Sequence, residues 1–216
     1  MYRKFVKRLI DILVCLVALP FFLLIFIVVA PLIKLSDGGP VFYNAPRLGY
    51  KGKIFKMYKF RSMRVNAPDI RNADGSTYNG ANDPRVTKIG KFLRETSLDE
   101  TPQILNVLKG DMSIIGPRGF LTTDYEGFEK LSDKEQCRLM VRPGITGYSQ
   151  AYYRNNATQQ EKIDCDVYYV NNLSWILDIK ILIKTVAVVL GKENIYVASD
   201  AEKADAPSEI VGARDQ

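Results

Sequence analysis

The N-terminal part of the chain contains one long apolar block between two basic ones. The stretch from Ile12 to Ile33 is a run of 22 residues without a charge. As a straight helix this run would be about 33 Å long, close to the hydrocarbon core of a bilayer. Lys and Arg flank both ends, and Pro20 lies inside, where it would kink or break a helix. Because basic flanks prefer the cytoplasmic side, a kinked hairpin that returns to its own side fits both the flanks and the proline. A straight, single-pass helix fits only the length, and both alternatives stay open.

The remaining pattern predicts short helices and strands separated by turns. Residues 36–66 are expected to form a loop followed by extended, basic structure, and residues 66–85, rich in Asn, Asp, Gly and Pro, an exposed loop. A short strand between two turns is expected in residues 110–119, and a loop or strand in residues 142–150. Helices are expected in residues 86–95, 98–109, 124–140, 159–171 and 174–190. The last of these carries three charges among apolar residues, which favours an interfacial or core-packed helix over a spanning one.

These elements predict an α+β fold that is mostly helical and has a membrane anchor. The anchor covers residues 1–35, and one folded domain with short strands and interfacial amphipathic helices covers residues 36–190. Residues 191–216 are polar, rich in Ala, Asp, Glu and Lys, and are expected to form a disordered tail.

Composition limits the chemistry that the chain can perform. Its net charge of +6 indicates an acidic partner: nucleic acid, an anionic membrane surface or phosphate-bearing substrates. The apolar anchor argues against nucleic acid. The sequence has no histidine, which excludes Ser-His-Asp triads, Cys-His dyads and histidine-ligated metals. Cys15, Cys137 and Cys165 lie far apart and indicate neither a disulfide framework nor a zinc site.

Two basic features are candidates for phosphate contacts. Residues 51–64 hold six Lys or Arg residues, which could rest on anionic lipid headgroups, contact substrate phosphates, or do both. Arg118 lies between Gly-Pro and Gly, where its planar guanidinium suits a phosphate that approaches the backbone closely. A single Arg in a turn is, however, usually a surface residue. The glycine-rich nucleotide motifs GxGxxG and the P-loop are absent from the sequence.

Asp99 and Glu100 are adjacent carboxylates at the start of a predicted helix. In one register, which the local pattern favours, Ser97 caps the helix and Glu100 completes a capping box. In the other, Thr101 is the cap and Pro102 the first helical residue, so the two acids stand just outside the N-terminus. An ionised Asp in that place is a competent nucleophile toward phosphorus, and a neighbouring carboxylate can hold Mg²⁺.

Six short motifs follow one another along the chain. They are Lys59–Met63, Ser97–Glu100, Asn106–Ser113, Ile115–Arg118, Val141–Gly147 and Asp166–Val170. In order and spacing this set resembles the bacterial sugar transferase family, the monotopic polyprenyl-phosphate phosphoglycosyl transferases. The resemblance covers about residues 1–190, and its specificity comes from the six motifs together, since no single one would be convincing.

The resemblance implies a re-entrant N-terminal helix, broken at Pro20, and a small cytosolic catalytic domain. It implies that Asp99 attacks the β-phosphate of a UDP-sugar, expels UMP and forms a covalent sugar-phosphoryl aspartate. A polyprenyl phosphate, such as undecaprenyl phosphate, then attacks this intermediate to give polyprenyl diphospho-sugar. This would be the first membrane step of glycoconjugate or exopolysaccharide biosynthesis. Glu100, together with Asp99, is expected to hold Mg²⁺.

The resemblance also implies substrate-binding residues and partners. Lys59, Arg118 and Asp166 match polar positions expected near the substrate. Arg61 and Arg142, which belong to the same motifs, are assigned to substrate binding as well. The expected partners are a UDP-sugar, a polyprenyl phosphate and membrane lipid, with a homodimer allowed and no nucleic acid. The expected location is the cytoplasmic face of the bacterial inner membrane.

Three positions depart from the family's usual pattern. Leu19 stands where a Ser commonly precedes the helix-breaking proline, so no hydroxyl is available to the freed backbone. Gly119 replaces the second proline of a Pro-Arg-Pro turn, which loosens the turn that carries Arg118. Tyr148 stands where the family usually has Trp.

Two other functions fit parts of the sequence. A glycosyl transferase could use Asp164 and Asp166, a DxD pattern, to bind a metal–nucleotide, and it would release UDP instead of UMP. A non-catalytic, membrane-anchored scaffold would not depend on Asp99. Within the favoured reaction, residues 66–85 are the candidate for donor selectivity, which exchanging this loop with a relative of different donor preference would test.

Overall fold

Helix α1, Lys7–Asp37, is the longest element and, among the described residues, the one helix that is long and apolar enough to cross a membrane. It follows a π-helical turn at Tyr2–Val6. This computed structural model describes residues 2–70, 78, 80, 82–122, 125–153 and 157–191. The predicted C-terminal tail, apart from Gly191, lies outside the described residues, as do residues 71–77, 79 and 81 of the predicted loop.

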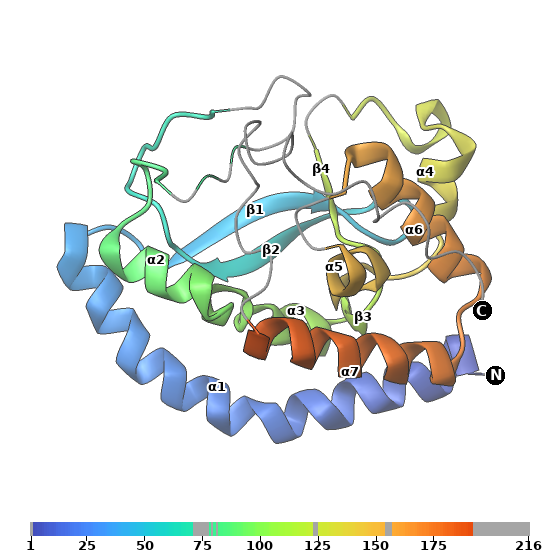
Figure 1. The fold of residues 1–216 in the computed structure, drawn as a ribbon, viewed down its shortest axis with the longest axis horizontal. Helices are drawn as coiled ribbons and strands as arrows, with labels where there is room; N and C mark the ends of the chain where they lie inside the picture. Colours follow the sequence, from blue (N-terminus) through green and yellow to red (C-terminus); the bar gives the residue numbers. More distant parts are fainter. Residues whose placement is uncertain are drawn as a thin grey trace.

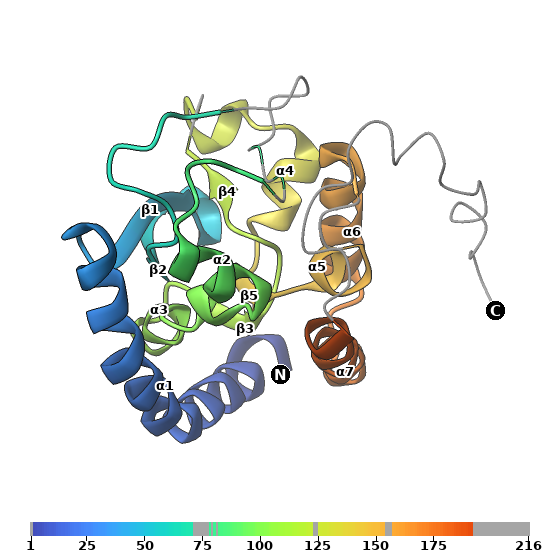
Figure 2. The ribbon, with the colours of Figure 1, turned by 60° about the vertical axis from the view of Figure 1, so that its left-hand side comes forward.

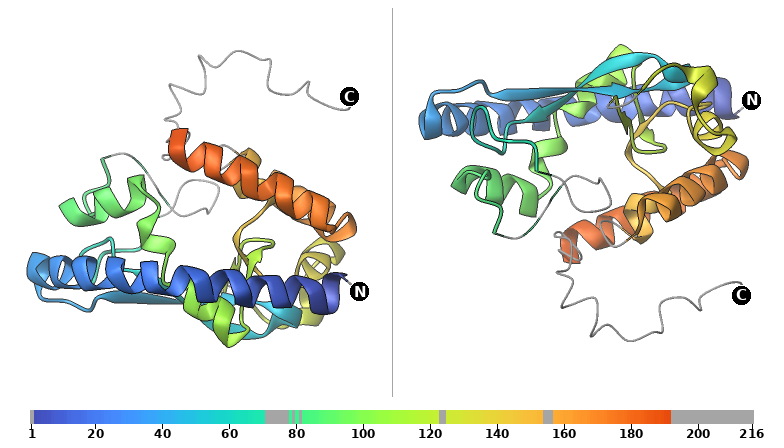
Figure 3. Two further views of the ribbon diagram at one scale, coloured as in Figure 1. Left: turned by 90° about the horizontal axis from the view of Figure 1, so that it is seen from below. Right: turned by 90° about the horizontal axis from the view of Figure 1, so that it is seen from above.

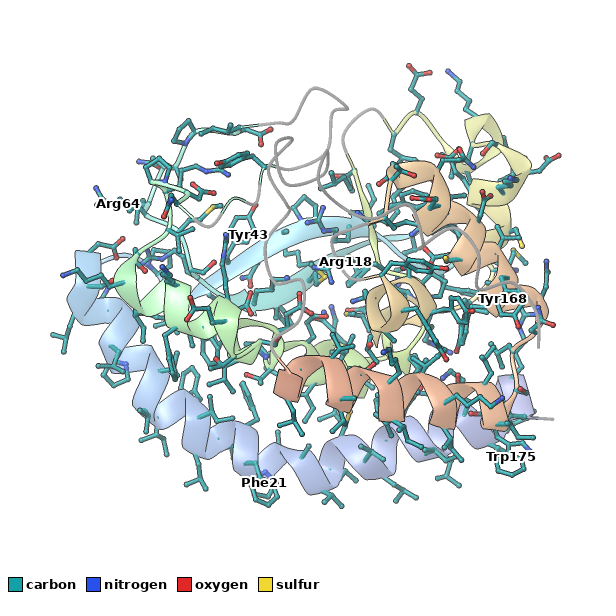
Figure 4. All side chains as sticks on the ribbon, in the orientation of Figure 1. Phe21, Tyr43, Arg64, Arg118, Tyr168 and Trp175 are labelled. Atoms are coloured by element: carbon teal, nitrogen blue, oxygen red, sulfur yellow. The ribbon has the colours of Figure 1, made fainter. Side chains whose placement is uncertain are left out.

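Helix α1 bends in its middle, so that both of its arms rise toward the rest of the protein (Figure 1 and Figure 2). Phe21 lies at the lowest point of the bend (Figure 4). It directly follows Pro20, which lacks an amide hydrogen and removes one helical hydrogen bond. Gly38 ends the helix in the left-handed conformation, with φ 72°, and its amide donates to the carbonyl of Lys34. The helix predicted over Ile12–Ile33 is confirmed and extends further at both ends.

Within the described ranges, two small sheets lie on the inner side of α1. The first has the strand order β2-β1-β4 with antiparallel pairs, so β2 is an edge strand among the described strands, and the second pairs β3 and β5 in parallel. The strand bounds are β1 Phe42–Leu48, β2 Ile54–Phe60, β3 Ser113–Ile115, β4 Phe120–Leu121 and β5 Gly144–Thr146. The extended structure predicted for the basic segment after α1 is confirmed, and the segment forms a β-hairpin, which the sequence did not predict.

The helices that follow the hairpin lie below it and to its right in Figure 1. Their bounds are α2 Lys88–Glu95, α3 Gln103–Lys109, α4 Asp133–Arg138, α5 Tyr148–Tyr152, α6 Gln159–Asn171 and α7 Trp175–Gly191. Short 3-10 turns stand at η2 Tyr50–Gly52, η3 Leu98–Glu100 and η4 Phe128–Lys130. Seen from below, α1 and α7 form the nearest layer and lie side by side near the N-terminus (Figure 3).

The hydrophobic core has two parts. The first joins the inner side of α1 to the hairpin, α2 and α3, and its buried members are Cys15, Phe22, Val29, Ile33, Phe55, Met57, Phe60, Leu93, Ile104, Val107 and Met112. The second joins β3 to α5, α6 and α7, and its buried members are Ile115, Val141, Ala151, Tyr169, Val170 and Ile181. Since α1 supplies four residues to the first part, it is an integral piece of the folded domain.

Polar contacts bind both arms of α1 to the domain. On the first arm, Lys7 forms a buried ion pair of 2.7 Å with Asp178 of α7. Asp11, one turn later, accepts hydrogen bonds from the beginning of β3. On the second arm, Asp37 accepts hydrogen bonds of 2.6 and 2.5 Å from the guanidinium of Arg61. The two ends of α1 are thus fixed to the same folded body.

The single helix predicted over residues 124–140 is wrong. Among the described residues of that range, the structure has only the η4 turn and the short helix α4. Gly127, at φ 140°, adopts a conformation that no helix contains. Ser132 and Glu135 then form a capping box, which starts a new helix at Asp133. The helix predicted over residues 98–109 is likewise divided, into η3 and α3.

Candidate active site

Lys59, Glu100 and Arg118 come together from three separate elements. Lys59 lies near the end of β2, Glu100 ends the η3 turn and Arg118 follows β3. Oε1 of Glu100 accepts a hydrogen bond from Lys59 Nζ at 2.5 Å and another from Arg118 Nη2 at 2.9 Å. Arg118 appears near the centre of the view in Figure 4, above α7, and its side chain is partly exposed. Two cations therefore converge on one carboxylate oxygen.

The η3 turn keeps Asp99 and Glu100 outside helix α3. Ser97, just before the turn, has a left-handed backbone with φ 57°, and its side chain makes no capping hydrogen bond. The hydroxyl of Thr101 donates a hydrogen bond to the carbonyl of Leu98 in the turn. Pro102 lies immediately before the first residue of α3. The capping-box register is therefore wrong. The alternative register, with Thr101 as cap and Pro102 as the first helical residue, is displaced by one residue, because α3 begins at Gln103. Its consequence, that both acids precede the helix, is confirmed.

Glu100 is held in its ionised form by the two cations. Burial alone would raise the pKa of Glu100, but the charges and hydrogen bonds of Arg118 and Lys59 outweigh it and keep that pKa well below its usual range. Glu100 in turn raises the pKa of Arg118 above its already high value. The three side chains thus form a charged cluster that is present before any substrate binds.

Asp99 differs from its neighbour. In the part of the chain that the structure describes, its carboxylate has no hydrogen-bond or ion-pair partner. Burial raises the pKa of Asp99, the charge of Lys59 acts in the opposite direction, and the negative charge of Glu100 adds to the rise. A carboxylate with a raised pKa and unengaged oxygens is more basic and better placed to attack an electrophile than one fixed in an ion pair.

Arg94 of α2 is a further cation near Asp99 that the sequence did not single out. Its positive charge opposes the rise in the pKa of Asp99 that burial causes. Its Nε donates a hydrogen bond to Ser62 Oγ at 3.0 Å. Arg94 belongs to the basic helix predicted over residues 86–95. The sequence pattern could not show which basic residue of that helix faces the acids, because this depends on how α2 packs against η3.

Arg61 and Arg142, two predicted substrate-binding residues, are engaged elsewhere. Arg61 is buried and donates to Asp37 and to two backbone carbonyls, so it fixes the segment between α1 and the hairpin. Arg142 is exposed, and its Nε donates to the carbonyl of Gly110 at the end of α3. The contacts of both residues are structural, and substrate binding by either of them stays a prediction.

Asp166 of α6 is buried, with 1% of its surface exposed, and forms an ion pair with Arg138 of α4. The guanidinium of Arg138 lies 3.7 Å from the ring centroid of Phe120 and donates to the carbonyl of Arg118 at 3.0 Å. Burial raises the pKa of Asp166 to about 6, against the opposing charge of Arg138. Asp166 is therefore linked to the candidate active site indirectly. It pairs with Arg138, and Arg138 donates a hydrogen bond to the backbone carbonyl of Arg118.

Asp164 and Asp166 do not form a joint metal site. Asp164 is exposed and forms an ion pair of 2.6 Å with Lys134, whereas Asp166 faces the core. Residues two positions apart on a helix point to different sides, which explains the separation. The structure does not support the DxD interpretation.

Asp99 and Glu100 suit a hard divalent cation. Their carboxylate oxygens are the kind of ligand that Mg²⁺ prefers, and the second oxygen of Glu100 has no hydrogen-bond partner among the described residues. A group of three or more His, Cys, Asp or Glu side chains that could hold an ion is not found in the described ranges. Substrate phosphates and water would complete the coordination, as is common for Mg²⁺.

Comparison with known protein families identifies the family. A family model described as bacterial sugar transferase matches residues 2–192. The chain belongs to the bacterial sugar transferase family. The match extends from the beginning of α1 to the end of α7, so every residue of the candidate site in this sugar transferase lies within it.

Named relatives of this sugar transferase align over most of its length. Galactosyl transferase CpsE of Streptococcus agalactiae serotype III is 43% identical over 192 residues, which cover 85% of this chain and 42% of the relative. The UDP-glucose:undecaprenyl-phosphate glucose-1-phosphate transferase of Xanthomonas campestris pv. campestris is 42% identical over 171 residues, 76% of this chain and 34% of the relative. Exopolysaccharide production protein ExoY of Rhizobium meliloti is 38% identical over 202 residues, 88% of each chain. This chain thus spans less than half of the first two relatives and most of the third.

Proposed function

We propose that this sugar transferase moves a sugar-1-phosphate from a UDP-sugar to a polyprenyl phosphate such as undecaprenyl phosphate and releases UMP. The observation that carries the proposal is the charged cluster, in which Lys59 and Arg118 converge on Glu100. The neighbouring carboxylate of Asp99 has no hydrogen-bond or ion-pair partner among the described residues. The name of the Xanthomonas relative, which specifies UDP-glucose, undecaprenyl phosphate and glucose-1-phosphate, adds support.

The proposed reaction has two displacement steps at one phosphorus atom. First, a carboxylate oxygen of Asp99 forms a bond to the β-phosphorus of the donor, the bond to the bridging oxygen breaks, and UMP leaves with that oxygen. Next, an oxygen of the polyprenyl phosphate forms a bond to the same phosphorus, and the bond to Asp99 breaks. Neither step needs a proton transfer, since nucleophiles and leaving groups are anions, and this agrees with a chain that has no histidine.

Lys59 and Arg118 supply the positive charge that this reaction needs. Both substrates and the pentavalent transition state are negative, so fixed cations stabilise the chemistry most where solvent is excluded. Glu100 holds the two cations within 2.9 Å of one oxygen and thereby keeps them close together before substrates arrive. Arg118, which is partly exposed, presents a planar group suited to phosphate oxygens.

Glu100 and Asp99 are further proposed to hold Mg²⁺, on the basis of their paired oxygen ligands. Bound Mg²⁺ would offset negative charge on the donor diphosphate. Glu100 would then have two roles. Its Oε1 accepts hydrogen bonds from Lys59 and Arg118, and its other carboxylate oxygen would bind the metal.

The shape and surface of α1 favour a re-entrant membrane helix over a spanning one. Its first arm is bonded to the domain through Lys7 and Asp11, and its second arm through Asp37. Both ends therefore belong on the same side of any membrane that the bend enters. Since Lys and Arg flank both ends of the apolar run, that side is proposed to be the cytoplasmic one.

The outer faces of α1 and α7 supply the apolar surface for this insertion. Large exposed apolar side chains on the two helices include Leu9, Leu13, Val17, Phe21, Leu24, Val28, Leu32, Trp175, Ile179, Ile183 and Leu190. Phe21 and Trp175 both point to the lower edge of the protein (Figure 4). A surface of this extent is unusual in water. We place it in the inner leaflet of the bacterial cytoplasmic membrane. A homodimer stays a prediction.

Nucleotide release tests the proposed function. The protein in nanodiscs is incubated with undecaprenyl phosphate, Mg²⁺ and a panel of UDP-sugars, and the nucleotide product is identified by chromatography. UMP, lost when EDTA removes the metal and restored by added Mg²⁺, is the expected result. UDP would support a glycosyl transferase instead. UMP release that persists in EDTA would retain the reaction but exclude the metal.

A further inference from the structure

The outer edge of strand β2 is paired with a side chain in place of a strand. Because β2 is an edge strand, the backbone groups of Lys56 and Tyr58 on its outer edge need partners when they are covered by α3. Asn106 of α3 provides both. Its Oδ1 accepts from the amide of Tyr58 at 2.8 Å, and its Nδ2 donates to the carbonyl of Lys56 at 2.8 Å.

Asn106 is suited to this task by both burial and chemistry. It is 0% exposed, so water cannot replace either hydrogen bond. Its carboxamide is the shortest side-chain group that carries one acceptor and one donor in a planar fork, which matches the alternation of N–H and C=O along a strand. A carboxylate would place an acceptor against the carbonyl of Lys56, and an apolar side chain would leave two buried backbone groups without partners.

The position of Asn106 links the two segments that carry the charged cluster. Tyr58 directly precedes Lys59, and α3 follows the η3 turn that ends at Glu100. Figure 1 shows α3 beneath β2. The two hydrogen bonds of Asn106 join these elements. The carbonyl of Asn106 also accepts the amides of Gly110, Asp111 and Met112, which closes the end of α3 before the chain enters β3. A shift of α3 along β2 would therefore change the separation of Lys59 and Glu100.

We propose that Asn106 is a positioning residue whose carboxamide sets the register of α3 on β2 and thereby the placement of Glu100 against Lys59. The kinetic part of this inference rests on the proposed function. Its geometric part does not, because the Lys59–Glu100 contact can be measured without any substrate.

The test compares Asn106→Leu and Asn106→Asp with Val107→Ala. Val107 is the next residue of α3, is equally buried and makes no side-chain contact of this polar kind, so it reports the effect of loosening the core alone. Labelling of lysines with an amine-reactive reagent, followed by mass spectrometry, measures how well Lys59 is held. The exposed Lys53 is the internal reference. The second readout is kcat and KM for UMP release.

In both Asn106 variants we expect Lys59 to be labelled several-fold faster relative to Lys53, and in Val107→Ala at the wild-type rate. We expect kcat to fall by about tenfold or more, since small misplacements of catalytic groups cost this much, with KM changed less. In a Lys59→Met background the Asn106 substitutions should lower kcat by less than about twofold further, because coupled residues are not additive.

Two results would overturn the inference: Lys59 labelling in both Asn106 variants equal to the wild type, or changes no larger than those of Val107→Ala. A wild-type protein that releases no UMP, but in which the Asn106 variants still increase Lys59 labelling, would refute the proposed function and leave the positioning role intact.

Discussion

Lys59 donates a hydrogen bond of 2.5 Å to Glu100, although 41 residues separate the two in the sequence. The contact joins an edge strand to a short turn, and the side chains of both residues are mostly buried. Arg118 reaches the same oxygen from a third segment. The cluster is therefore a product of the tertiary fold, and the proposed reaction depends on it.

Replacing Lys59 by Met should lower UMP release by about a hundredfold or more, because one fixed charge at the transition state is removed. Lys56→Met is the matched control, since Lys56 is an exposed lysine of the same strand. Steady-state UMP release in nanodiscs measures both. Equal activity of the two variants would mean that Lys59 serves only the structure or the membrane surface.

The buried Asp166–Arg138 pair should be sensitive to a change that the exposed Asp164 tolerates. Asp166→Asn leaves Arg138 buried without a counter-charge, which typically costs about 3 kcal/mol of stability or more. Arg138 is then held less firmly against the carbonyl of Arg118, so UMP release should fall. Asp164→Asn, on the same helix, should stay within about 0.5 kcal/mol of the wild type. Thermal unfolding in detergent gives the stabilities, and an equal loss of activity in both variants would revive the DxD interpretation.

The end of α1 should show a pH-dependent stability. The hydrogen bonds from Arg61 lower the pKa of Asp37 to about 2, compared with about 3.9 in an unfolded chain. The folded form therefore favours the ionised state, and this contribution is present above about pH 4 and is lost as the pH falls toward 2.

Asp37→Asn should accordingly lower the unfolding temperature at pH 6, and the difference from the wild type should shrink as the pH is reduced from about 4 to about 2. The exposed Glu129→Gln variant is the control. A difference that stays constant over this range would show that the Arg61 contact does not depend on the charge of Asp37.

The re-entrant course of α1 predicts that both ends face the cytoplasm. Cys137 and Cys165 are replaced by Ser, and single cysteines are introduced at the exposed positions Arg3 and Ser36. A membrane-impermeant maleimide should then label both variants in inside-out vesicles and neither in right-side-out vesicles. Labelling of the two from opposite faces would establish a spanning helix.

The sequence pattern predicted elements best where local signals define their ends. Helix α6 matches its prediction because Thr158 and Glu161 form a capping box, and α3 ends at Gly110 in the left-handed conformation. The error at residues 124–140 was avoidable, because the capping box of Ser132 and Glu135 is also a local pattern and would have predicted a helix that starts at Asp133. Local patterns also misled, because the capping box expected at Ser97 and Glu100 does not form.

The candidate site was predictable only in part. The motifs identified Asp99, Glu100, Lys59 and Arg118, but no spacing along the chain shows which cation meets which carboxylate. Helical periodicity would have separated Asp166, on the buried side of α6, from Asp164. Tertiary contacts of single side chains were not predictable. Asn106 of α3 begins one of the six motifs, but the motif does not show that its side chain pairs with β2, and Arg138 belongs to none of them.

The most direct test of the account is to trap the first step without the acceptor. The enzyme in nanodiscs free of polyprenyl phosphate is mixed with a reactive UDP-sugar and Mg²⁺, quenched, digested and analysed by mass spectrometry. We expect up to one equivalent of UMP, and a sugar-phosphoryl group on Asp99 that disappears when undecaprenyl phosphate is added. Asp99→Asn should give neither. UMP that forms only when the acceptor is present, or a phosphosugar on another residue, would contradict the assignment of Asp99 as the nucleophile.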